Sequence, residues 1–374
     1  MLDEKYMRFA IQLAEQMKGQ TTPNPPVGAV VVNNQTIVGF GAHMTSGEAH
    51  AEVIALEMAG ENARGSTVYV TLEPCTHFGK TAPCADLLIE KQVKKVVIAC
   101  IDVHDKVAGE GVAKLKDAGI EVETGYLRQE AIHLYDVFFY SITSKLPFVT
   151  VKTAVSLDGK TATVGQESKW ITNKTARLDA HLYRHQHDAI LVGVNTVIKD
   201  NPKLTTRIPG GRNPIRIILD THLRTPTNAK IVTDGEAETW IFIGKRTPSS
   251  KLKKFTHSFV RIFQMEDETL EMRKVLEILS KENVSSLFVE GGATINGSLL
   301  KEKLINQLII YMAPILIGGK DAPGPFGGEG FHHLRESYHL QISEITQIDD
   351  QIKIVAKKED MNVHGNCRGK GSNN

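Results

Sequence analysis

HAEVIALEMAG (50–60), STVYVTLE (66–73), CADLLIEKQ (84–92) and KKVVIACI (94–101) are the segments that decide the fold of the first half of the chain. The first and third have the residues and length of short helices, and the second and fourth are strand-length runs rich in valine and isoleucine. Helix and strand therefore alternate along this stretch. Such alternation predicts a layered α/β sheet.

The same pattern extends on both sides of this stretch. Apolar residues at helical spacing predict a helix over 3–18 that Gly19 ends, and VGAVVV (27–32) with TIVGFGAH (36–43) predicts a β-hairpin. Downstream, EGVAKLKDAG (110–119) predicts a helix and IEVETG (120–125) a strand. The first half thus forms one α/β unit.

A second set of elements begins at LPFVTVKTA (146–154), where Pro147 follows a helical segment ending near Ser144. Helices are expected over 174–186, 267–281 and 294–302, and strands over 189–194, 214–220, 239–244, 285–292 and 306–316. These strands are apolar enough to be buried on both faces. The predicted domains are therefore residues 1–146 and 147–361, followed by a disordered tail over 362–374.

Composition limits the class of protein. A length of 374 residues predicts two or three domains, and a net charge of +1 provides no field that would gather nucleic acid or anionic lipid. Four cysteines are too few for a disulfide scaffold, and we find neither a signal peptide nor a membrane span. We expect a cytoplasmic enzyme with a small-molecule substrate, no nucleic-acid or membrane partner, and a homo-oligomeric state.

One cluster of residue types in the first half indicates metal chemistry. His50, Cys75 and Cys84 offer one imidazole and two thiolates, a set that suits zinc and leaves a fourth position for water. Glu52 lies two residues from His50, where a carboxylate could exchange protons with that water without binding the metal. The alternatives are buried structural cysteines or a structural zinc module, although structural sites normally have four protein ligands. His77 is a further candidate zinc ligand, but the simpler interpretation is that it is an exposed histidine in a loop.

Two other features are ambiguous on residue chemistry alone. Asn24 could present a donor and an acceptor to a pyrimidine edge, or simply form a turn between prolines. Glu290-Gly291-Gly292 ends a strand and precedes a helix, so it could hold a pyrophosphate or be an ordinary tight turn. There is no G-x-G-x-x-G after a first strand, so a classical dinucleotide fold is not supported.

The pattern H-A-E (50–52), P-C (74–75) and C (84) resembles that of zinc-dependent nucleobase deaminases. The long insert between the cysteines, together with PNPPVGAVVV (23–32), GAHMTSGEAHAEV (41–53) and VTLEPCTHFGKTAPC (70–84), is similar to the deaminase half of the bifunctional deaminase-reductases of riboflavin biosynthesis. VTVKTAVSLDGKTAT (149–163), SKWIT (168–172), LVGVNTVIKDNPKLTTR (191–207), RIILD (216–220) and LFVEGGATINGSLL (287–300) resemble their reductase half.

This resemblance implies both architecture and chemistry. The first domain would be a cytidine-deaminase-like α/β/α sandwich with Zn²⁺, and the second a dihydrofolate-reductase-like α/β domain with NADPH. The chain would deaminate 2,5-diamino-6-(5-phosphoribosylamino)pyrimidin-4(3H)-one and then reduce its ribosyl chain to give 5-amino-6-(5-phosphoribitylamino)uracil. The runner-up is a cytidine- or tRNA-type deaminase fused to a similar reductase domain that acts on another substrate.

The resemblance also assigns site residues by position. In the deaminase, Glu52 would be catalytic, His50, Cys75 and Cys84 would bind zinc, and Asn24, His43, Lys80 and Thr81 would contact substrate. In the reductase, substrate would contact Lys152, Ser168, Arg184, Leu204, Arg207 and Glu290, and NADPH would contact Ala154, Trp170, Thr196, Asp200, Thr221, Gly292, Ala293, Thr294, Ile295, Asn296, Gly297 and Ser298. Lys152 and Asp200 are candidates to polarise or protonate the sugar. Trp170 could stack on the nicotinamide or fill the core, and Asp158 is expected to organise a turn.

Overall fold

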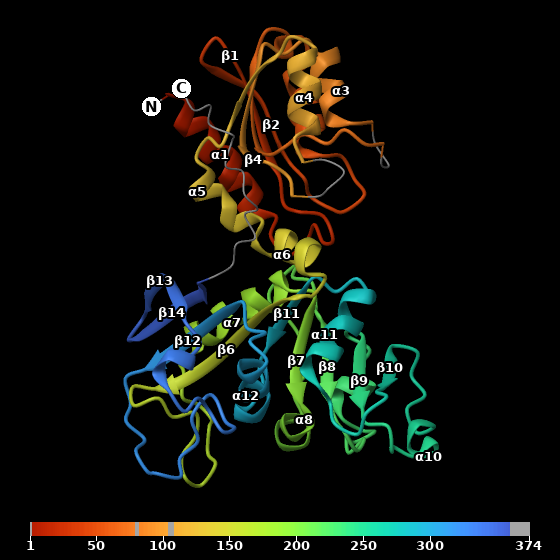
Figure 1. Cartoon of the computed structure of the whole chain (residues 1–374), viewed down its shortest axis with the longest axis vertical. Helices are drawn as coiled ribbons and strands as arrows, with labels where there is room; N and C mark the ends of the chain where they lie inside the picture. Colours follow the sequence, from red (N-terminus) through yellow and green to blue (C-terminus); the bar gives the residue numbers. More distant parts are fainter. Residues whose placement is uncertain (1, 79–81, 104–107, 360–374) are drawn as a thin grey trace. The chain divides into compact units, whose positions relative to one another are not determined.

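The computed structural model describes residues 2–78, 82–103 and 108–359. These residues form two compact units, one ending at Lys145 and the other beginning at Leu146 (Figure 1). The predictions for Lys80, Thr81, Cys367 and the tail over 362–374 lie outside the described residues. Among the described helices, none has both the length and the apolar character that crossing a bilayer requires.

The first unit is a sheet between two layers of helices. Its elements are α1 (Leu2–Gln16), β1 (Gly28–Asn33), β2 (Thr36–Ala42), α2 (Ala51–Ala59), a 3₁₀ turn (Gly60–Ala63), β3 (Thr67–Leu72), α3 (Cys84–Glu90), β4 (Lys95–Cys100), α4 (Glu110–Asp117), β5 (Glu121–Thr124), α5 (Arg128–Ala131), a 3₁₀ turn (Ile132–Leu134) and α6 (Asp136–Ser144). The strand order among the described residues is β2-β1-β3-β4-β5. The predicted hairpin of β1 and β2 is antiparallel, and β3, β4 and β5 are parallel.

Glycines allow two helices to lie directly on the sheet of the first unit. A Cβ on Gly28 would lie 2.0 Å from the Ala10 carbonyl oxygen of α1, and a Cβ on Gly39 would lie 2.1 Å from the Ala55 carbonyl oxygen of α2. Gly28 of β1 and Gly39 of β2 contact different helices, because side chains alternate between the two faces of a sheet. A Cβ on Gly41 would lie 2.5 Å from the Ala51 carbonyl oxygen, so the start of α2, which follows His50, is also held against the sheet.

The second unit contains a larger mixed sheet. Its elements are β6 (Phe148–Ser156), α7 (Lys174–Gln186), β7 (Ala189–Gly193), α8 (Val194–Asp200), β8 (Ile215–Leu219), α9 (Lys230–Thr233), β9 (Thr239–Ile243), α10 (Ser249–Leu252), β10 (Val260–Gln264), α11 (Met272–Lys281), β11 (Ser286–Val289), α12 (Ala293–Lys301), β12 (Gln307–Ala313), a 3₁₀ turn (Leu334–Glu336), β13 (Leu340–Ile348) and β14 (Gln351–Lys358). The strand order among the described residues is β10-β9-β8-β7-β11-β6-β12-β14-β13. The sheet is parallel from β10 to β12, while β14 and β13 are antiparallel.

This order brings distant segments side by side. β11 pairs with both β6 and β7, so the ends of three strands separated in sequence meet at one edge (Figure 1). Glu290 follows β11 at this edge, and its backbone N–H donates to the Leu191 carbonyl oxygen at 3.1 Å. A ligand site at the carboxyl ends of parallel strands is the usual place in open α/β sheets.

The predicted α/β class holds for both units, with local differences. The helix expected over 267–281 begins only at Met272, and the strand expected over 306–316 ends at Ala313. The C-terminal hairpin of β13 and β14 was not expected from the sequence, although QIKI (351–354) alternates polar and apolar residues. Trp170 does not fill the core, since 69% of its surface is exposed and the Arg177 guanidinium lies 4.4 Å from its ring centre.

Candidate active sites

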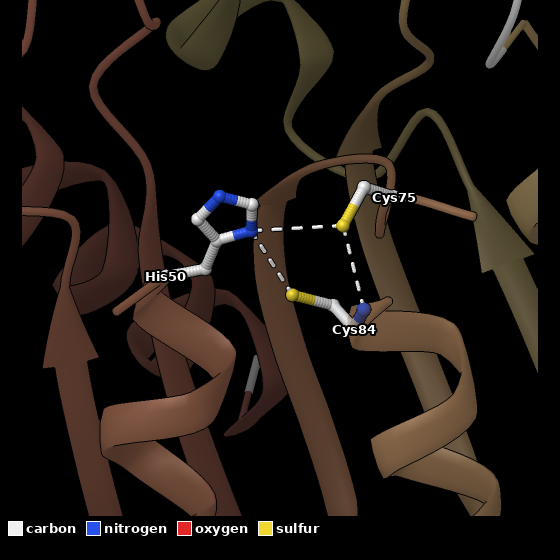
Figure 2. A group of neighbouring side chains, drawn as sticks. All are labelled: His50, Cys75 and Cys84. Carbon is white, nitrogen blue, oxygen red and sulfur yellow. Dashed lines mark hydrogen bonds between the residues drawn. The ribbon is translucent and has the colours of Figure 1, made fainter. Parts of the chain in front are cut away.

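The first site forms where two helices begin beside the end of a strand. His50 is the residue that precedes α2, Cys84 is the first residue of α3, and Cys75 lies in the loop after β3. Figure 2 shows the His50 ring and the two sulfurs pointing toward one another from these three places. The structure therefore brings together the three zinc ligands expected from the sequence.

The geometry of these three side chains fits one zinc ion. Nδ1 of His50 lies 3.2 Å from Sγ of Cys84 and 3.6 Å from Sγ of Cys75. All three donor atoms lie within 4.8 Å of one another. Zinc bonds of about 2.0–2.3 Å in a tetrahedron place two ligands about 3.5 Å apart, so the donor set matches in both chemistry and spacing. Three protein ligands leave one position open, as in catalytic zinc sites.

The two thiols have different protonation preferences. The pKa of Cys75 is lowered to about 4, because it accepts hydrogen bonds from the Cys84 side chain, His50 and the Cys84 backbone N–H, which outweigh the opposing effect of burial. The pKa of Cys84 is raised, first by the Cys75 thiolate to which its thiol donates and then by burial. One thiolate is thus present already, and metal binding would release the proton of the other.

Glu52 is a buried carboxyl beside the ligand cluster. Only 4% of the residue is exposed, and its pKa is raised to about 7, first by burial and then by the Cys75 thiolate. The donor atoms of the cluster come from His50, Cys75 and Cys84, so the Glu52 carboxyl is left for proton transfer. A carboxyl in this environment can accept and return a proton near neutral pH.

Asn24 and His43 lie next to this cluster. Asn24 Nδ2 lies 3.2 Å from His43 Nε2, and His43 Nδ1 lies 3.1 Å from the Ala49 carbonyl oxygen. The His43 ring meets the His50 ring edge-on, with centres 5.3 Å apart. Of the four expected substrate residues, the structure therefore places His43 beside the ligand His50 and Asn24 beside His43, while Lys80 and Thr81 lie outside the described residues. His77 is exposed, and Cys100 is buried within β4 as a core residue.

The second site lies at the end of β6 and β11. Arg184 of α7 donates to both Glu290 carboxylate oxygens, at 2.8 and 3.0 Å, and to the Thr205 carbonyl oxygen at 2.9 Å. Burial alone would raise the pKa of Glu290, but the charges of Arg184 and Lys152 hold it at about 2. Glu290 is thus ionised and in a fixed orientation.

The charges of two guanidinium groups act on His181. Its pKa is lowered to about 4 by burial and then by the charges of Arg184 and Arg207. Both guanidinium charges therefore lie close enough to the His181 ring to disfavour its protonation. His181 was not singled out from the sequence, although its position three residues before Arg184 on α7 places it on the same helix face.

A cavity of about 160 Å³ adjoins these charges. It is lined by Lys152, Thr153, Ala154, Thr161, Glu290, Gly291, Gly292, Ala293, Asn296 and Pro325. Six of these residues were expected from the sequence to contact substrate or NADPH. Thr153, Thr161, Gly291 and Pro325 were not assigned, because β6 and the loop carrying Pro325 meet only in the folded chain.

The turn into α12 has the close backbone packing that its glycines suggest. A Cβ on Gly297 would lie 2.0 Å from the Gly327 carbonyl oxygen, so only glycine fits there without movement. Asn296 is buried, and its Nδ2 donates to the Pro325 carbonyl oxygen at 2.9 Å. Ser298 Oγ donates to the Thr294 carbonyl oxygen at 3.1 Å, within the helix.

The other expected reductase residues differ in their surroundings. Asp200 pairs with Lys169 at 2.6 Å, and the Thr221 carbonyl oxygen accepts the Gly244 backbone N–H at 2.9 Å. Leu204 is a core residue at 3% exposure. Ser168 and Arg207 are exposed, whereas Thr196 and Ile295 are half-buried. Asp158 organises a turn as expected, since its carboxylate accepts from Ser156 and from two backbone N–H groups.

Comparison with known proteins accounts for both sites. Residues 1–100 match the cytidine and deoxycytidylate deaminase zinc-binding region, and residues 147–354 match the RibD C-terminal domain. This chain belongs to the RibD family. It is an enzyme of riboflavin biosynthesis with a deaminase and a reductase activity, and the zinc expected from the sequence is the metal of the matched deaminase region.

Relatives match along nearly the whole chain. The riboflavin biosynthesis protein RibD of Bacillus amyloliquefaciens is 49% identical over 360 residues, which are 96% of this chain and 97% of the relative. The RibD of Escherichia coli is 38% identical, over 94% of this chain and 98% of the relative.

Solved structures agree with the fold. Acinetobacter baumannii RibD has a TM-score of 0.85 and 37% identity, covering 95% of this chain and 98% of the other. A Thermotoga maritima protein described as diaminohydroxyphosphoribosylaminopyrimidine deaminase/5-amino-6-(5-phosphoribosylamino)uracil reductase has a TM-score of 0.86 and 34% identity, covering 96% and 99%. The expected two-domain architecture is therefore confirmed.

Proposed function

We propose that this chain deaminates 2,5-diamino-6-(5-phosphoribosylamino)pyrimidin-4(3H)-one and then reduces the ribosyl chain of the product. The observation that carries the proposal is the cluster of His50, Cys75 and Cys84 with Glu52 buried beside it. The long insert between the cysteines and the second unit favour this substrate over that of a cytidine- or tRNA-type deaminase. We assign deamination to residues 1–146 and reduction to 147–361.

In the deamination, the residues of the first unit position water and pyrimidine. When bound, zinc makes a water at its open position more acidic. Glu52 takes a proton from the attacking water and passes it to the departing amine, so that the oxygen bonds to C2 while the C2–N bond breaks and ammonia leaves. Asn24 contacts the base, and His43, which lies beside His50, faces the ribose phosphate. Burial of Glu52 keeps bulk water from its carboxyl.

In the reduction, the second unit orients the sugar against the cofactor. When bound, NADPH supplies the hydride that reduces C1′ of the opened ribosylamine. The turn from Gly292 to Ser298 would hold the cofactor's phosphates, because the first backbone N–H groups of α12 point out of the helix. Arg184 and Arg207 would bind the sugar phosphate, a group that guanidinium contacts with two hydrogen bonds.

The local charge balance supports a phosphate ligand in the second site. Arg184 and Lys152 bring two positive charges to the carboxylate of Glu290, and the charge of Arg207 acts on His181 in the same region. Lys152 also lines the cavity, where its ammonium could protonate or polarise the sugar. We further propose a cytoplasmic location and a homo-oligomeric state, which follow from the sequence composition and from the prevalence of symmetric oligomers among soluble enzymes.

Mass spectrometry of the substrate after incubation with the zinc-loaded enzyme tests the proposal. We expect an amino group to be replaced by oxygen without cofactor, and a gain of two hydrogens only when NADPH is added. An enzyme that binds zinc and is folded, yet leaves this compound unchanged, would overturn the substrate assignment.

Metal removal tests whether the zinc is catalytic or structural. Chelation should abolish deamination while reduction of the deaminated compound by NADPH continues. Unfolding of the first unit on chelation would instead indicate that the metal is structural.

A further inference from the structure

Glu73 is a buried carboxyl group to which the proposed deamination gives no role. It stands two residues before Cys75, and only 4% of it is exposed. Its Oε2 accepts the Gly109 backbone N–H at 3.0 Å and the Asp102 backbone N–H at 3.3 Å. Its Oε1 accepts the Val112 backbone N–H at 3.1 Å. Both oxygens therefore bind main-chain groups that follow strand β4.

These hydrogen bonds cap helix α4 from another element. The first N–H groups of a helix have no partner within it and usually bond to the side chain of the N-cap residue. The N-cap residue of α4 is Gly109, which has no side chain. Glu73 takes this part, because it accepts from the main chain of Gly109, Gly111 and Val112. The start of α4 is thereby bonded to the residue that follows β3.

The start of α4 also packs directly on the segment that carries Cys75. Gly111 is buried in the first turn of α4, and a Cβ there would lie 2.3 Å from the Pro74 carbonyl oxygen. The same Cβ would lie 3.1 Å from Glu73 Oε1. Because this contact is close-packed, a displacement of α4 is transmitted to Pro74 and so to Cys75.

Helix α3 holds the same segment from its other end. The Ala85 backbone N–H donates to the Cys75 carbonyl oxygen at 3.1 Å, and the Cys84 backbone N–H donates to Cys75 Sγ at 3.4 Å. Figure 1 shows α3 and α4 side by side, and Lys114 and Asp86 form a salt bridge of 2.5 Å between them. The segment that carries Cys75 thus lies between the starts of two helices.

We propose that Glu73 is a positioning residue of the zinc site: by capping α4 it fixes the strand end that carries Cys75, and so places the Cys75 sulfur for the metal. The donor atoms of the cluster come from His50, Cys75 and Cys84, so Glu73 acts through Cys75. Removing a group that orients a metal ligand typically costs about 10–100-fold in metal affinity or activity. This inference rests on the zinc site of the proposed deamination, whichever pyrimidine is the substrate.

The first test measures zinc affinity in Glu73→Gln, which keeps the size of the side chain. An amide has a single accepting oxygen, and its NH₂ group would face main-chain N–H groups. We expect the zinc affinity of the full chain, measured by competition with a chromophoric chelator, to fall about 10–100-fold. An unchanged affinity in the folded variant would overturn the proposal.

Cobalt substitution reports on the sulfur ligands directly. Co²⁺ bound in place of zinc gives a sulfur-to-metal charge-transfer band that depends on the geometry of the cobalt–sulfur bonds. We expect this band to shift or weaken in Glu73→Gln. A residue that only stabilised the fold would lower the midpoint of urea unfolding, followed by circular dichroism, and leave the band and the zinc affinity unchanged. That result would overturn the proposal.

A second variant reaches the same strand end from α4. Gly111→Ala keeps the Glu73 carboxyl group but introduces a Cβ that displaces the Pro74 carbonyl. We expect the cobalt band to change and the zinc affinity to fall here as well. Should Glu73→Gln fail to fold, this variant decides the matter, since an unchanged band and affinity would refute the coupling between α4 and Cys75.

Glu110→Gln is the matched control. Glu110 is an exposed acidic residue in the first turn of α4. Its replacement removes a carboxyl group from the same helix end and leaves the hydrogen bonds of Glu73 in place. Zinc affinity and the cobalt band should therefore stay at wild-type values. A loss as large as that in Glu73→Gln would show that charge at the helix end is responsible, and would overturn the proposal.

Failure of this proposal differs from failure of the proposed function, because the metal measurements need no substrate. If the pyrimidine is left unchanged but Glu73→Gln alters the zinc affinity and the cobalt band, only the substrate assignment is wrong. If deamination occurs and both metal measurements are unchanged in the variant, only the positioning role of Glu73 is wrong.

Discussion

Replacing Arg184 by methionine should destabilise the second unit, and the loss should depend on pH. Arg184 donates to both oxygens of Glu290, and the side chains of the pair are only 12% and 17% exposed. Methionine is similar in length but carries no charge. The substitution therefore leaves the Glu290 carboxylate with Lys152 as its remaining cationic neighbour.

The pKa of Glu290 sets the size of the effect. Burial would raise it, but Arg184 and Lys152 lower it from the ordinary value of 4.5 to about 2. Each tenfold change in an acid dissociation constant is worth about 1.4 kcal/mol, so this carboxylate contributes about 3 kcal/mol above pH 5. Losses of roughly 3–5 kcal/mol are typical when one partner of a buried ion pair is removed. We expect Arg184→Met to lower the free energy of unfolding by about 3 kcal/mol at pH 7.

The pH dependence follows from the direction of the shift. Because the folded pKa lies below the unfolded one, the stabilisation is complete above pH 4.5 and disappears as the pH falls toward 2. At pH 3 the difference between wild type and variant should be about 1 kcal/mol. The variant is thus most impaired at neutral pH.

Urea unfolding followed by tryptophan fluorescence measures this unit selectively. Both tryptophans of the chain, Trp170 and Trp240, lie in the second unit, and Trp240 is buried at 2% exposure. Arg246→Met is the matched control, since Arg246 and its partner Glu268 are exposed, and should cost at most about 1 kcal/mol. A loss below 1 kcal/mol at pH 7, or the same loss at pH 3 as at pH 7, would refute the reasoning.

Three further substitutions test the two sites separately. Glu52→Gln should reduce deaminase kcat by about 10²–10⁴-fold while zinc content, measured by atomic absorption, stays at the wild-type value; loss of the metal would mean that Glu52 is a ligand. Cys84→Ser should lower zinc content and deamination together, with NADPH-dependent reduction preserved; a variant that keeps its zinc would contradict the ligand set. Gly297→Ala places a Cβ 2.0 Å from the Gly327 carbonyl oxygen, so we expect the second unit to lose about 1–3 kcal/mol by urea unfolding. An unchanged midpoint would show that this contact can relax.

Much of the first unit follows from local patterns. Helix α2 and strand β3 lie within the ranges that the sequence predicts, 50–60 for the helix and 66–73 for the strand. Both could be predicted because the spacing of apolar residues reflects which face of an element is buried. The cluster of His50, Cys75 and Cys84 was also expected from the sequence, since few residue types bind zinc and these three stand close to the ends of helices and strands. The hairpin of β13 and β14 was missed because β13 is largely exposed, so its apolar pattern is weak.

The second site shows what spacing along the chain does not reveal. Arg184 and Glu290 are 106 residues apart, yet they share two hydrogen bonds because β11 inserts between β7 and β6. Thr161 and Pro325 join the same region through contacts that no local pattern encodes.

The sequence by itself determined the types of residue available for chemistry and the order of helices and strands, because both depend on side-chain identity and local burial. Only the tertiary structure decided which distant groups meet and which charges are buried together. Those properties depend on strand order, which is not a property of a local segment.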